Sequence, residues 1–282
     1  NDINNIAVKE NMFIDKDTFD VKKFYTEIQK DELWNRLNFI FSFFKKTNRT
    51  DIISIPKFKT QKECKPKPGS ETSPKYMNFS LKELTKIIDF ALNNAFFTIG
   101  KHILKQINGL PIGDPISGPL AFCYVAYDEH HWKIPQHIHD KHIKVFIIRC
   151  ADDILRIILT KHKHDTYINE IDNLITHHLY ENNLTKKNLQ IIQDNNESNK
   201  YLDSDIIIYN TGKRIKLIYH NKNADILERK EQKIGRFHHK NVDMPERSKM
   251  SGPGAILIRI YDYTSLKIDM IKPIMELCTE LK

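Results

Sequence analysis

Short apolar runs separated by polar turns recur along the chain and predict strands joined as hairpins. Three such pairs are present: 96–99 with 102–107, 145–148 with 154–159, and 206–209 with 215–219. Runs of this length with a short polar break between them are typical of antiparallel hairpins. The pair at 145–159 flanks two adjacent aspartates, Asp152 and Asp153, and we expect these carboxylates at its turn.

Apolar residues at three- and four-residue spacing predict helices elsewhere in the chain. The expected helices cover 24–44, 80–92, 117–132, 166–179 and much of 255–282, with an interruption at Pro273. The second of these begins at a capping box, Ser80 to Glu83, in which side chains satisfy the first backbone donors. The polar, lysine-rich segment 57–76 predicts a surface loop.

The size and charge of the chain indicate how many domains it can form and what kind of partner it binds. With 282 residues, of which 40% are hydrophobic, the chain can bury the core of one large domain or of two subdomains. It carries 44 Lys and Arg against 36 Asp and Glu, which gives a net charge of +8. An excess of this size favours a polyanionic partner, RNA or DNA.

The four cysteines are far apart and form no CxxC pair, which indicates a reducing, intracellular compartment. No apolar run approaches the ~20 residues of a membrane span, so we expect no membrane association. The N-terminus has neither a signal-peptide core nor an initiator Met, and we interpret it as a processed or truncated end. Abundant Asn, Ile and Lys suggest AT-rich coding, which fits a nucleus or a mitochondrion.

Three motifs follow one another in an informative order. They are an aspartate at a strand end with an aromatic five residues later (Asp20 and Tyr25), a glycine- and proline-rich turn leading into a helix (106–120), and Cys150-Ala151-Asp152-Asp153. Together they resemble the palm motifs of reverse transcriptases. A fourth stretch, 200–206, resembles the strand that precedes the thumb, especially in Penelope-like retroelements.

The resemblance implies an α+β right-hand polymerase palm with a ferredoxin-like βαββαβ core. Residues 1–221 would form the palm, and residues 222–282 a thumb-like basic and helical region. The implied activity is RNA-directed DNA synthesis, in which a 3′-hydroxyl attacks an α-phosphate and pyrophosphate leaves.

The aspartate pair has two readings. Adjacent like charges repel, and an ordinary exposed turn would let solvent offset the repulsion. The resemblance implies instead that Asp20, Asp152 and Asp153 hold two Mg²⁺ ions, or Mn²⁺, which activate the attacking hydroxyl and stabilise the leaving group. Hard carboxylate oxygens are the ligands that Mg²⁺ prefers.

The resemblance also implies a set of nucleotide-binding residues: Tyr25, Gln106, Gly109, Pro111, Gly113 and Lys187. Tyr25 takes the position whose ring excludes a ribose 2′-hydroxyl, and the glycines would let backbone approach the nucleotide. Without the motif context, Tyr25 is equally a core aromatic, and the turn is equally a simple helix entry.

A basic segment near the C-terminus is expected to lie on nucleic acid. Its candidate contacts are Arg236, Lys240, Arg247 and Lys249, since guanidinium and ammonium groups suit phosphate oxygens. We expect the segment 235–260 to cross from palm to thumb as a loop and then to re-enter a core at 256–258, because Pro245 and the sequence 252–254 should break any continuous helix.

Three departures from the reverse transcriptase pattern keep other functions open. Cys150 replaces the usual tyrosine, Asp114 adds a negative charge beside the nucleotide turn, and only 19 residues precede Asp20, where a fingers subdomain is normal. Fingers supplied by a second chain, a truncation, or a polymerase relic would each explain the last point. A relic would be a non-catalytic, RNA-binding structural subunit of a ribonucleoprotein such as an organellar ribosome. A metal-dependent nuclease would use the same aspartates but would leave the glycine-proline turn unexplained.

Overall fold

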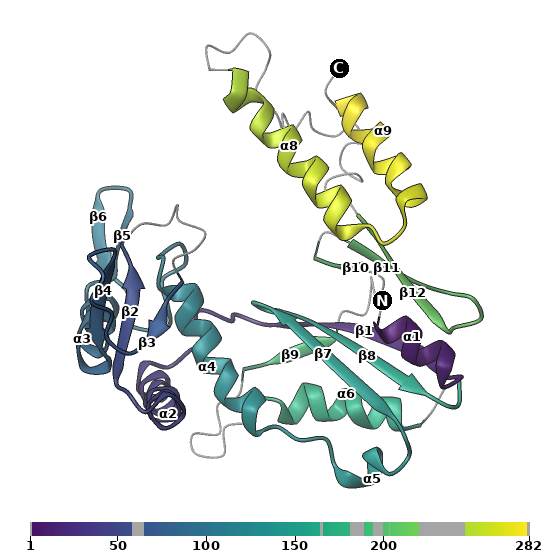
Figure 1. The fold of residues 1–282 in the computed structure, drawn as a ribbon, viewed down its shortest axis with the longest axis horizontal. Coiled ribbons are helices and arrows are strands. Elements are labelled where there is room, and N and C mark those ends of the chain that lie inside the picture. Colours follow the sequence, from purple (N-terminus) through teal and green to yellow (C-terminus); the bar gives the residue numbers. More distant parts are fainter. Residues whose placement is uncertain are drawn as a thin grey trace. The chain divides into compact units, whose positions relative to one another are not determined.

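The computed structural model describes residues 2–57, 65–163, 166–180, 189–193, 200–202, 204–219 and 246–280. The chain has a mixed α/β fold with antiparallel sheets and divides into two compact units. The first unit comprises Asn1–Asp20, Ile134–Asp172 and Ile192–Lys282, and the second comprises Val21–Lys133 and Asn173–Ile191 (Figure 1). The predicted domain boundary at 221/222 falls outside the described residues and stays a prediction.

The main sheet has four strands in the order β7-β8-β1-β9. Their bounds are β1 (Phe13–Val21), β7 (Lys144–Cys150), β8 (Asp153–Thr160) and β9 (Ile191–Gln193). β8 pairs antiparallel with both β1 and β7. Along the chain, helices separate β1 from β7, and α6 (Tyr167–His178) separates β8 from β9. Counting the strands of this sheet alone, with the helices between them, the order is β-α-β-β-α-β.

The two faces of the main sheet differ because side chains alternate along each strand. Ile14 and every second residue of β8 from Leu155 to Leu159 share one face and form a core with Ala7, from α1 (Asp2–Lys9). On the other face, Arg156 of β8 lies opposite Asp17 of β1. The sheet therefore has one apolar face next to α1, and a second face on which Arg156 and Asp17 lie among buried apolar side chains of both strands.

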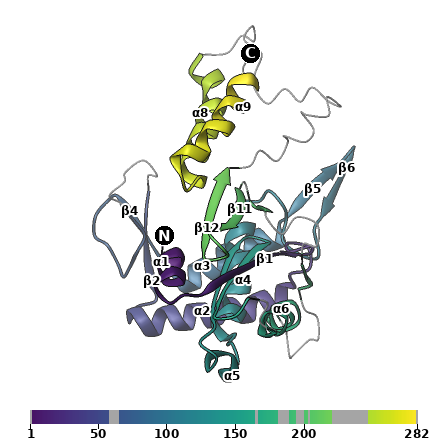
Figure 2. The same ribbon diagram turned by 90° about the vertical axis from the view of Figure 1, so that its right-hand side faces the viewer.

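A second sheet of the first unit leads into the C-terminal helices. Its strands are β10 (Lys200–Tyr201), β11 (Ser204–Tyr209) and β12 (Arg214–Tyr219), and the following elements are α8 (Glu246–Tyr263), the 3-10 helix η1 (Lys267–Met270) and α9 (Ile271–Glu280). Tyr219, Ile260 and Leu277 form a small core where these elements meet. Figure 2 shows α8 and α9 side by side.

The prediction of a broken loop over 235–260 is wrong for the part that the structure describes. The backbone of α8 runs without interruption from Glu246 to Tyr263, through Gly252, Pro253 and Gly254. A proline inside a helix costs about 3 kcal/mol. Burial of Ile260 in the core with Tyr219 and Leu277 opposes this cost.

The second unit is built on two packed helices, α2 (Lys30–Asn48) and α4 (Ser117–His131). Between them the buried guanidinium of Arg36 lies 2.6 Å from Asp128 Oδ2, donates to the Tyr124 carbonyl oxygen at 2.8 Å and stacks 3.6 Å over the Tyr124 ring. The Tyr124 hydroxyl donates to Glu32 at 2.5 Å. Burial raises the pKa of Asp128 to about 6 and also raises the pKa of Tyr124.

The rest of the second unit is a small sheet, a helix and an isolated hairpin. These are β2 (Ile52–Pro56), β3 (Lys67–Pro68), β4 (Tyr76–Ser80), α3 (Leu81–Asn93), β5 (Phe96–Ile99) and β6 (His102–Lys105). The capping box is confirmed, with Glu83 N donating to Ser80 Oγ and Ser80 N donating to the Glu83 carboxylate. The helix predicted over 24–44 begins only at Lys30, because Lys23 is left-handed (φ 53°) and turns the chain first.

Among the helices that the structure describes, none has both the length and the apolar character that crossing a bilayer requires.

Candidate active site

The β7–β8 hairpin and β1 bring the predicted catalytic aspartates together at one end of the central strands of the main sheet. Asp20 and Asp153 are directly opposed residues of the antiparallel β1–β8 pair, and Asp152 occupies the turn next to Asp153. Side chains of directly opposed residues project from the same face, with Cβ atoms about 5 Å apart. Asp20 precedes the pair by more than 130 residues in the sequence. The strand register brings the three aspartates close together in space.

The turn between β7 and β8 holds its aspartate with an unusual backbone. Cys150 and Asp153 close the turn, and Ala151 takes a left-handed conformation with φ 54°. This conformation costs a residue with a side chain roughly 1–2 kcal/mol, which is why glycine commonly occupies such positions. Arg149 Nη1 donates to the Ala151 carbonyl oxygen at 3.1 Å and supports the turn. Strain that surrounding contacts maintain is typical of functional sites.

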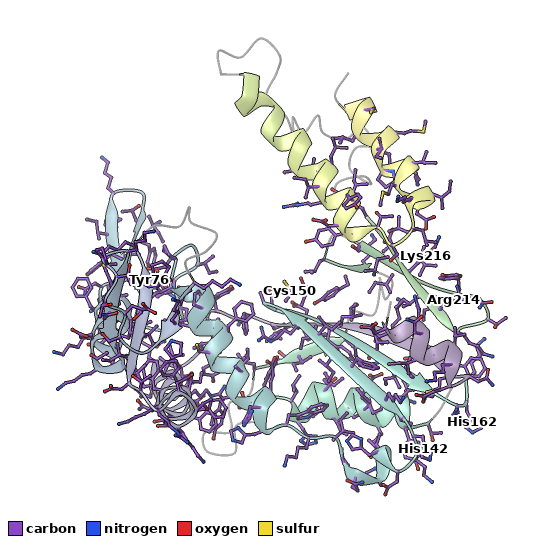
Figure 3. The ribbon with its side chains drawn as sticks, viewed as in Figure 1. Tyr76, His142, Cys150, His162, Arg214 and Lys216 are labelled. Atoms are coloured by element: carbon purple, nitrogen blue, oxygen red, sulfur yellow. The ribbon has the colours of Figure 1, made fainter. Side chains whose placement is uncertain are left out.

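At this end of the strands, a row of side chains crosses from β7 through β8 to β1. Cys150 pairs with Asp153, which pairs with Asp20, so the three share one face. Figure 3 shows Cys150 at the end of β7 where the hairpin turns, and His142 near the opposite end of the hairpin. The apolar α1 core lies on this same face farther along the strands, because Leu155 follows Asp153 by two positions.

Tyr201 of β10 lies beside this row. Its hydroxyl is 3.4 Å from the carbonyl oxygen of Ile148 and donates to it. Burial, aided by the negative charge of Asp153, raises the pKa of the Tyr201 phenol to about 12. The phenol therefore stays a neutral hydrogen-bond donor throughout the physiological pH range. The motif at 200–206 indicated this strand, but its position beside Asp153 comes from the tertiary structure.

The carboxylate oxygens at this end of the strands are donors that suit a hard cation. In the described part of the chain, no group of three or more His, Cys, Asp or Glu side chains is arranged to hold a metal ion by itself. Mg²⁺ usually binds proteins through one or two carboxylates and completes its shell with water and substrate phosphates. Opposed Asp20 and Asp153 with adjacent Asp152 supply donors of that kind. The donor chemistry therefore fits Mg²⁺ as a partner that also requires a phosphate ligand.

Beneath the aspartates, on the opposite face of the sheet, a buried arginine joins three acidic residues. The Arg156 side chain is 1% exposed, pairs with Asp15, lies 2.8 Å from Asp172 Oδ1 through Nε, and lies 3.6 Å from Asp17 Oδ2. Burial raises the pKa of Asp172 to about 6 although Arg156 opposes the rise. Sequence analysis missed this cluster; an arginine inside the apolar run 154–159 was the available signal.

In the second unit, the glycine-rich turn packs against the backbone of Tyr25. Leu110 is fully buried and its N–H donates to the Tyr25 carbonyl oxygen at 2.7 Å. Gly109 is left-handed (φ 72°), and a Cβ there would lie 2.7 Å from Thr26 Cα and 2.8 Å from the Tyr25 carbonyl oxygen. Only glycine allows this approach, so Gly109 fixes the backbone that carries Tyr25.

The other residues of this turn have local partners. Gln106 Nε2 donates to the Asn108 carbonyl oxygen at 3.0 Å, and Gly113 (φ 94°) faces open space. Asp114 Oδ1 accepts the backbone N–H of Ile116 at 2.9 Å, just before α4 begins. The charge that looked unfavourable for a triphosphate thus has a structural role at the start of a helix. Tyr25 is half-buried, with its ring 5.2 Å from that of Phe24.

Lys187 and the four basic residues of the C-terminal segment have no described side chains. Lys187, Arg236 and Lys240 lie outside the described residues. The backbones of Arg247 and Lys249 belong to α8, but their side chains also lie outside the description. The roles of all these residues stay predictions, as do those of the aspartates and of the nucleotide turn.

Comparison with known proteins gives a likeness in fold. No protein-family model and no curated protein sequence matches the chain. The solved structure of apo telomerase from Candida Tropicalis superposes with a TM-score of 0.50 over 77% of this chain and 35% of the telomerase chain, at 16% identity. The fold resembles part of telomerase. At this level of identity the likeness is one of fold alone.

A second comparison is similar in extent. Telomerase from Candida albicans, in complex with the TWJ fragment of telomeric RNA, gives a TM-score of 0.49 over 77% of this chain and 33% of that chain, at 12% identity. The present chain thus spans about a third of the length of these telomerase chains.

Proposed function

We propose that the chain is the palm, with part of the thumb, of an RNA-directed DNA polymerase. The observation that carries this proposal is the register of the main sheet, which pairs Asp20 with Asp153 beside Asp152 in the hairpin turn. A likeness in fold to a telomerase chain supports it. In this proposal α8 and α9 belong to the thumb, and RNA is the template.

The aspartates would have distinct roles. Asp20 and Asp152 would hold two Mg²⁺ ions, and Asp153 would support Asp20 from the opposed strand position. The bound ions would supply the positive charge that activates a primer hydroxyl and stabilises leaving pyrophosphate. The strained turn at Ala151 would keep the Asp152 carboxylate in place before any ligand arrives, and Tyr201 would donate a hydrogen bond beside Asp153 at neutral pH.

The nucleotide turn would hold the incoming dNTP. Tyr25 would close the space that a ribose 2′-hydroxyl needs, and its backbone position depends on Gly109 and Leu110. Gly113, with open space where a Cβ would lie, would let a phosphate or base approach the backbone.

Metal binding by an isosteric variant tests the proposal. Asp152→Asn removes one charge with little change in shape, and it should weaken Mn²⁺ binding by at least tenfold in calorimetry. Asp89→Asn, at an exposed position of α3, is the matched control and should bind Mn²⁺ as the wild type does. Equal Mn²⁺ affinity in wild type and Asp152→Asn would overturn the site assignment.

The same titration separates the rival function. A non-catalytic, RNA-binding structural subunit would bind RNA with an affinity that Asp152→Asn does not change and would show no Mn²⁺ heat at this site. Primer extension on an RNA template, with Mn²⁺ binding established, would then distinguish a polymerase from a nuclease by whether the primer lengthens or shortens.

A further inference from the structure

The β5–β6 hairpin leaves its apolar side chains in solvent on both faces. Every residue of both strands is exposed, and the hairpin forms a two-stranded sheet of its own. Phe96 is 58% exposed and Ile103 is 74% exposed on one face, while Phe97 and Ile99 are exposed on the other. Isolated two-stranded hairpins are marginally stable in water, and exposed apolar patches usually mark interaction sites.

The hairpin is nevertheless held firmly at its base. Lys30 Nζ donates to the Leu92 carbonyl oxygen at 2.9 Å and lies 3.5 Å from the Gln106 carbonyl oxygen. One ammonium group therefore contacts both the segment before the hairpin and the residue after it. Gln106 N also donates to the Ala95 carbonyl oxygen at 2.9 Å. Four residues later, Leu110 bonds to Tyr25. A ligand on the hairpin would therefore be held at a defined position relative to the nucleotide turn.

Charge indicates what covers this surface. No carboxylate occurs between Asp89 and Asp114, whereas Lys101, His102 and Lys105 are all exposed on the hairpin. Lys105 is directly opposed to Phe96, so an ammonium group and an aromatic ring share one face. A second copy of this chain would bring like charges together, which disfavours self-association. The surface calls for a partner that is anionic and also offers planar apolar groups.

We propose that the β5–β6 hairpin binds single-stranded nucleic acid. A base would stack on Phe96, and backbone phosphates would pair with Lys105 on the same face and with Lys101 in the turn. Phe97 would offer a second stacking surface on the opposite face. Stacking on aromatic rings combined with basic side chains is how proteins hold single strands without sequence preference. This inference rests on the proposed function in one respect: the bound strand is the unpaired template next to the Tyr25 turn.

Two variants and a labelled oligouridylate test the inference in the full 282-residue chain. Phe96→Leu with Phe97→Leu keeps apolar surface but removes the rings, and it should lower affinity for the single strand about tenfold. Lys101→Gln with Lys105→Gln should make the slope of log K against log salt shallower by about 1.4, since each single-strand phosphate contributes about 0.7. Binding to duplex RNA of equal length should change little.

Matched controls lie on α2 in the same unit. Phe43 is an exposed ring (53%), and Lys45 and Lys46 are exposed lysines. Phe43→Leu and the double change Lys45→Gln, Lys46→Gln should leave single-strand binding unchanged. Circular dichroism melting of each variant shows whether the fold is retained.

Three results would overturn the inference. One is wild-type affinity of the phenylalanine variant for the oligouridylate. Another is an equal loss in the α2 controls. The third is a wild-type dimer in sedimentation that the phenylalanine variant dissociates while oligouridylate affinity is unchanged, which would make this surface a contact between copies. All binding is measured without divalent metal, so the outcome is independent of the Asp152→Asn titration.

Discussion

The backbone N–H of Leu110 donates a 2.7 Å hydrogen bond to the carbonyl oxygen of Tyr25. The two residues are far apart in the sequence, yet this bond and the close packing of Gly109 on Thr26 join the two predicted nucleotide-binding segments. A nucleotide site in this unit would depend on that junction, because the Tyr25 ring can act as a gate only if its backbone is fixed.

Gly109→Ala should destabilise the second unit more than a change at any other glycine of the turn. The new Cβ would lie within 2.8 Å of backbone atoms of Tyr25 and Thr26 and would also be strained at φ 72°. We expect a loss of about 3 kcal/mol or more in the free energy of unfolding, from overpacking and backbone strain together. Gly113→Ala, also left-handed but with open space at its Cβ, should cost only about 1–2 kcal/mol. Urea unfolding of the two variants measures the difference, and equal losses would contradict the packing argument.

Ala151→Gly should stabilise the protein slightly while weakening the metal site. Glycine removes the cost of the left-handed conformation, about 1–2 kcal/mol, but makes the unfolded chain more flexible by about 0.4–1 kcal/mol. The net change in unfolding free energy should therefore lie between about zero and 1.5 kcal/mol. Mn²⁺ affinity should fall several-fold, because Asp152 would be less restrained.

Thr211→Gly is the control for this prediction. Thr211 is left-handed (φ 55°) in the turn between β11 and β12, away from the aspartates in sequence. It should gain at least as much stability as Ala151→Gly and keep wild-type Mn²⁺ affinity. A change in Mn²⁺ affinity in the Thr211 variant would show that stability alone governs the metal site.

Asp172 should make folding stability depend on pH in the mildly acidic range. Burial raises the pKa of this carboxyl from 3.8 to about 6, so the folded protein binds its proton more tightly than the unfolded chain does. The stabilising contribution is complete below pH 4 and is lost as the pH rises through 6. Asp172→Asn should flatten this part of the stability profile, measured by urea unfolding between pH 4 and 7.

Asp128, whose pKa burial also raises to about 6, gives the matching comparison. Asp128→Asn should also reduce the dependence of the unfolding free energy on pH. Its effect should be independent of that of Asp172→Asn, because Asp128 pairs with Arg36 in the other unit. A profile that Asp172→Asn leaves unchanged would show that Arg156 keeps the Asp172 carboxyl ionised in the folded protein at all these pH values.

Arg236 and Arg247 are predicted from the sequence to contact phosphates. Changing both to Gln should make the salt dependence of RNA binding shallower by up to about 1.4–1.8 in log K against log salt, the share of two phosphates. Thermal stability should stay nearly constant. A large loss of thermal stability, or a salt slope equal to that of the wild type, would place these arginines in the fold and not at the RNA.

The sequence by itself determined the local elements of this protein. The capping box at Ser80, the hairpin turning at Asp152 and the order of strands and helices all follow from patterns that span a few residues. Hydrogen bonds within a helix or across a tight turn join near neighbours in the chain, so their pattern can be read locally. The motif at Asp20 likewise indicated a strand, and β1 covers it.

Only the tertiary structure decided which distant residues meet. The opposition of Asp20 and Asp153, the burial of Arg156 among three aspartates, and the contact of Gly109 with Thr26 each depend on strand register or packing across long separations. The sequence alone likewise did not predict that α8 continues through Gly252-Pro253-Gly254. The helix propensity of glycine and proline opposes a helix there. Burial of Ile260 in the apolar core with Tyr219 and Leu277 favours it. This burial depends on contacts between segments that are far apart in the chain.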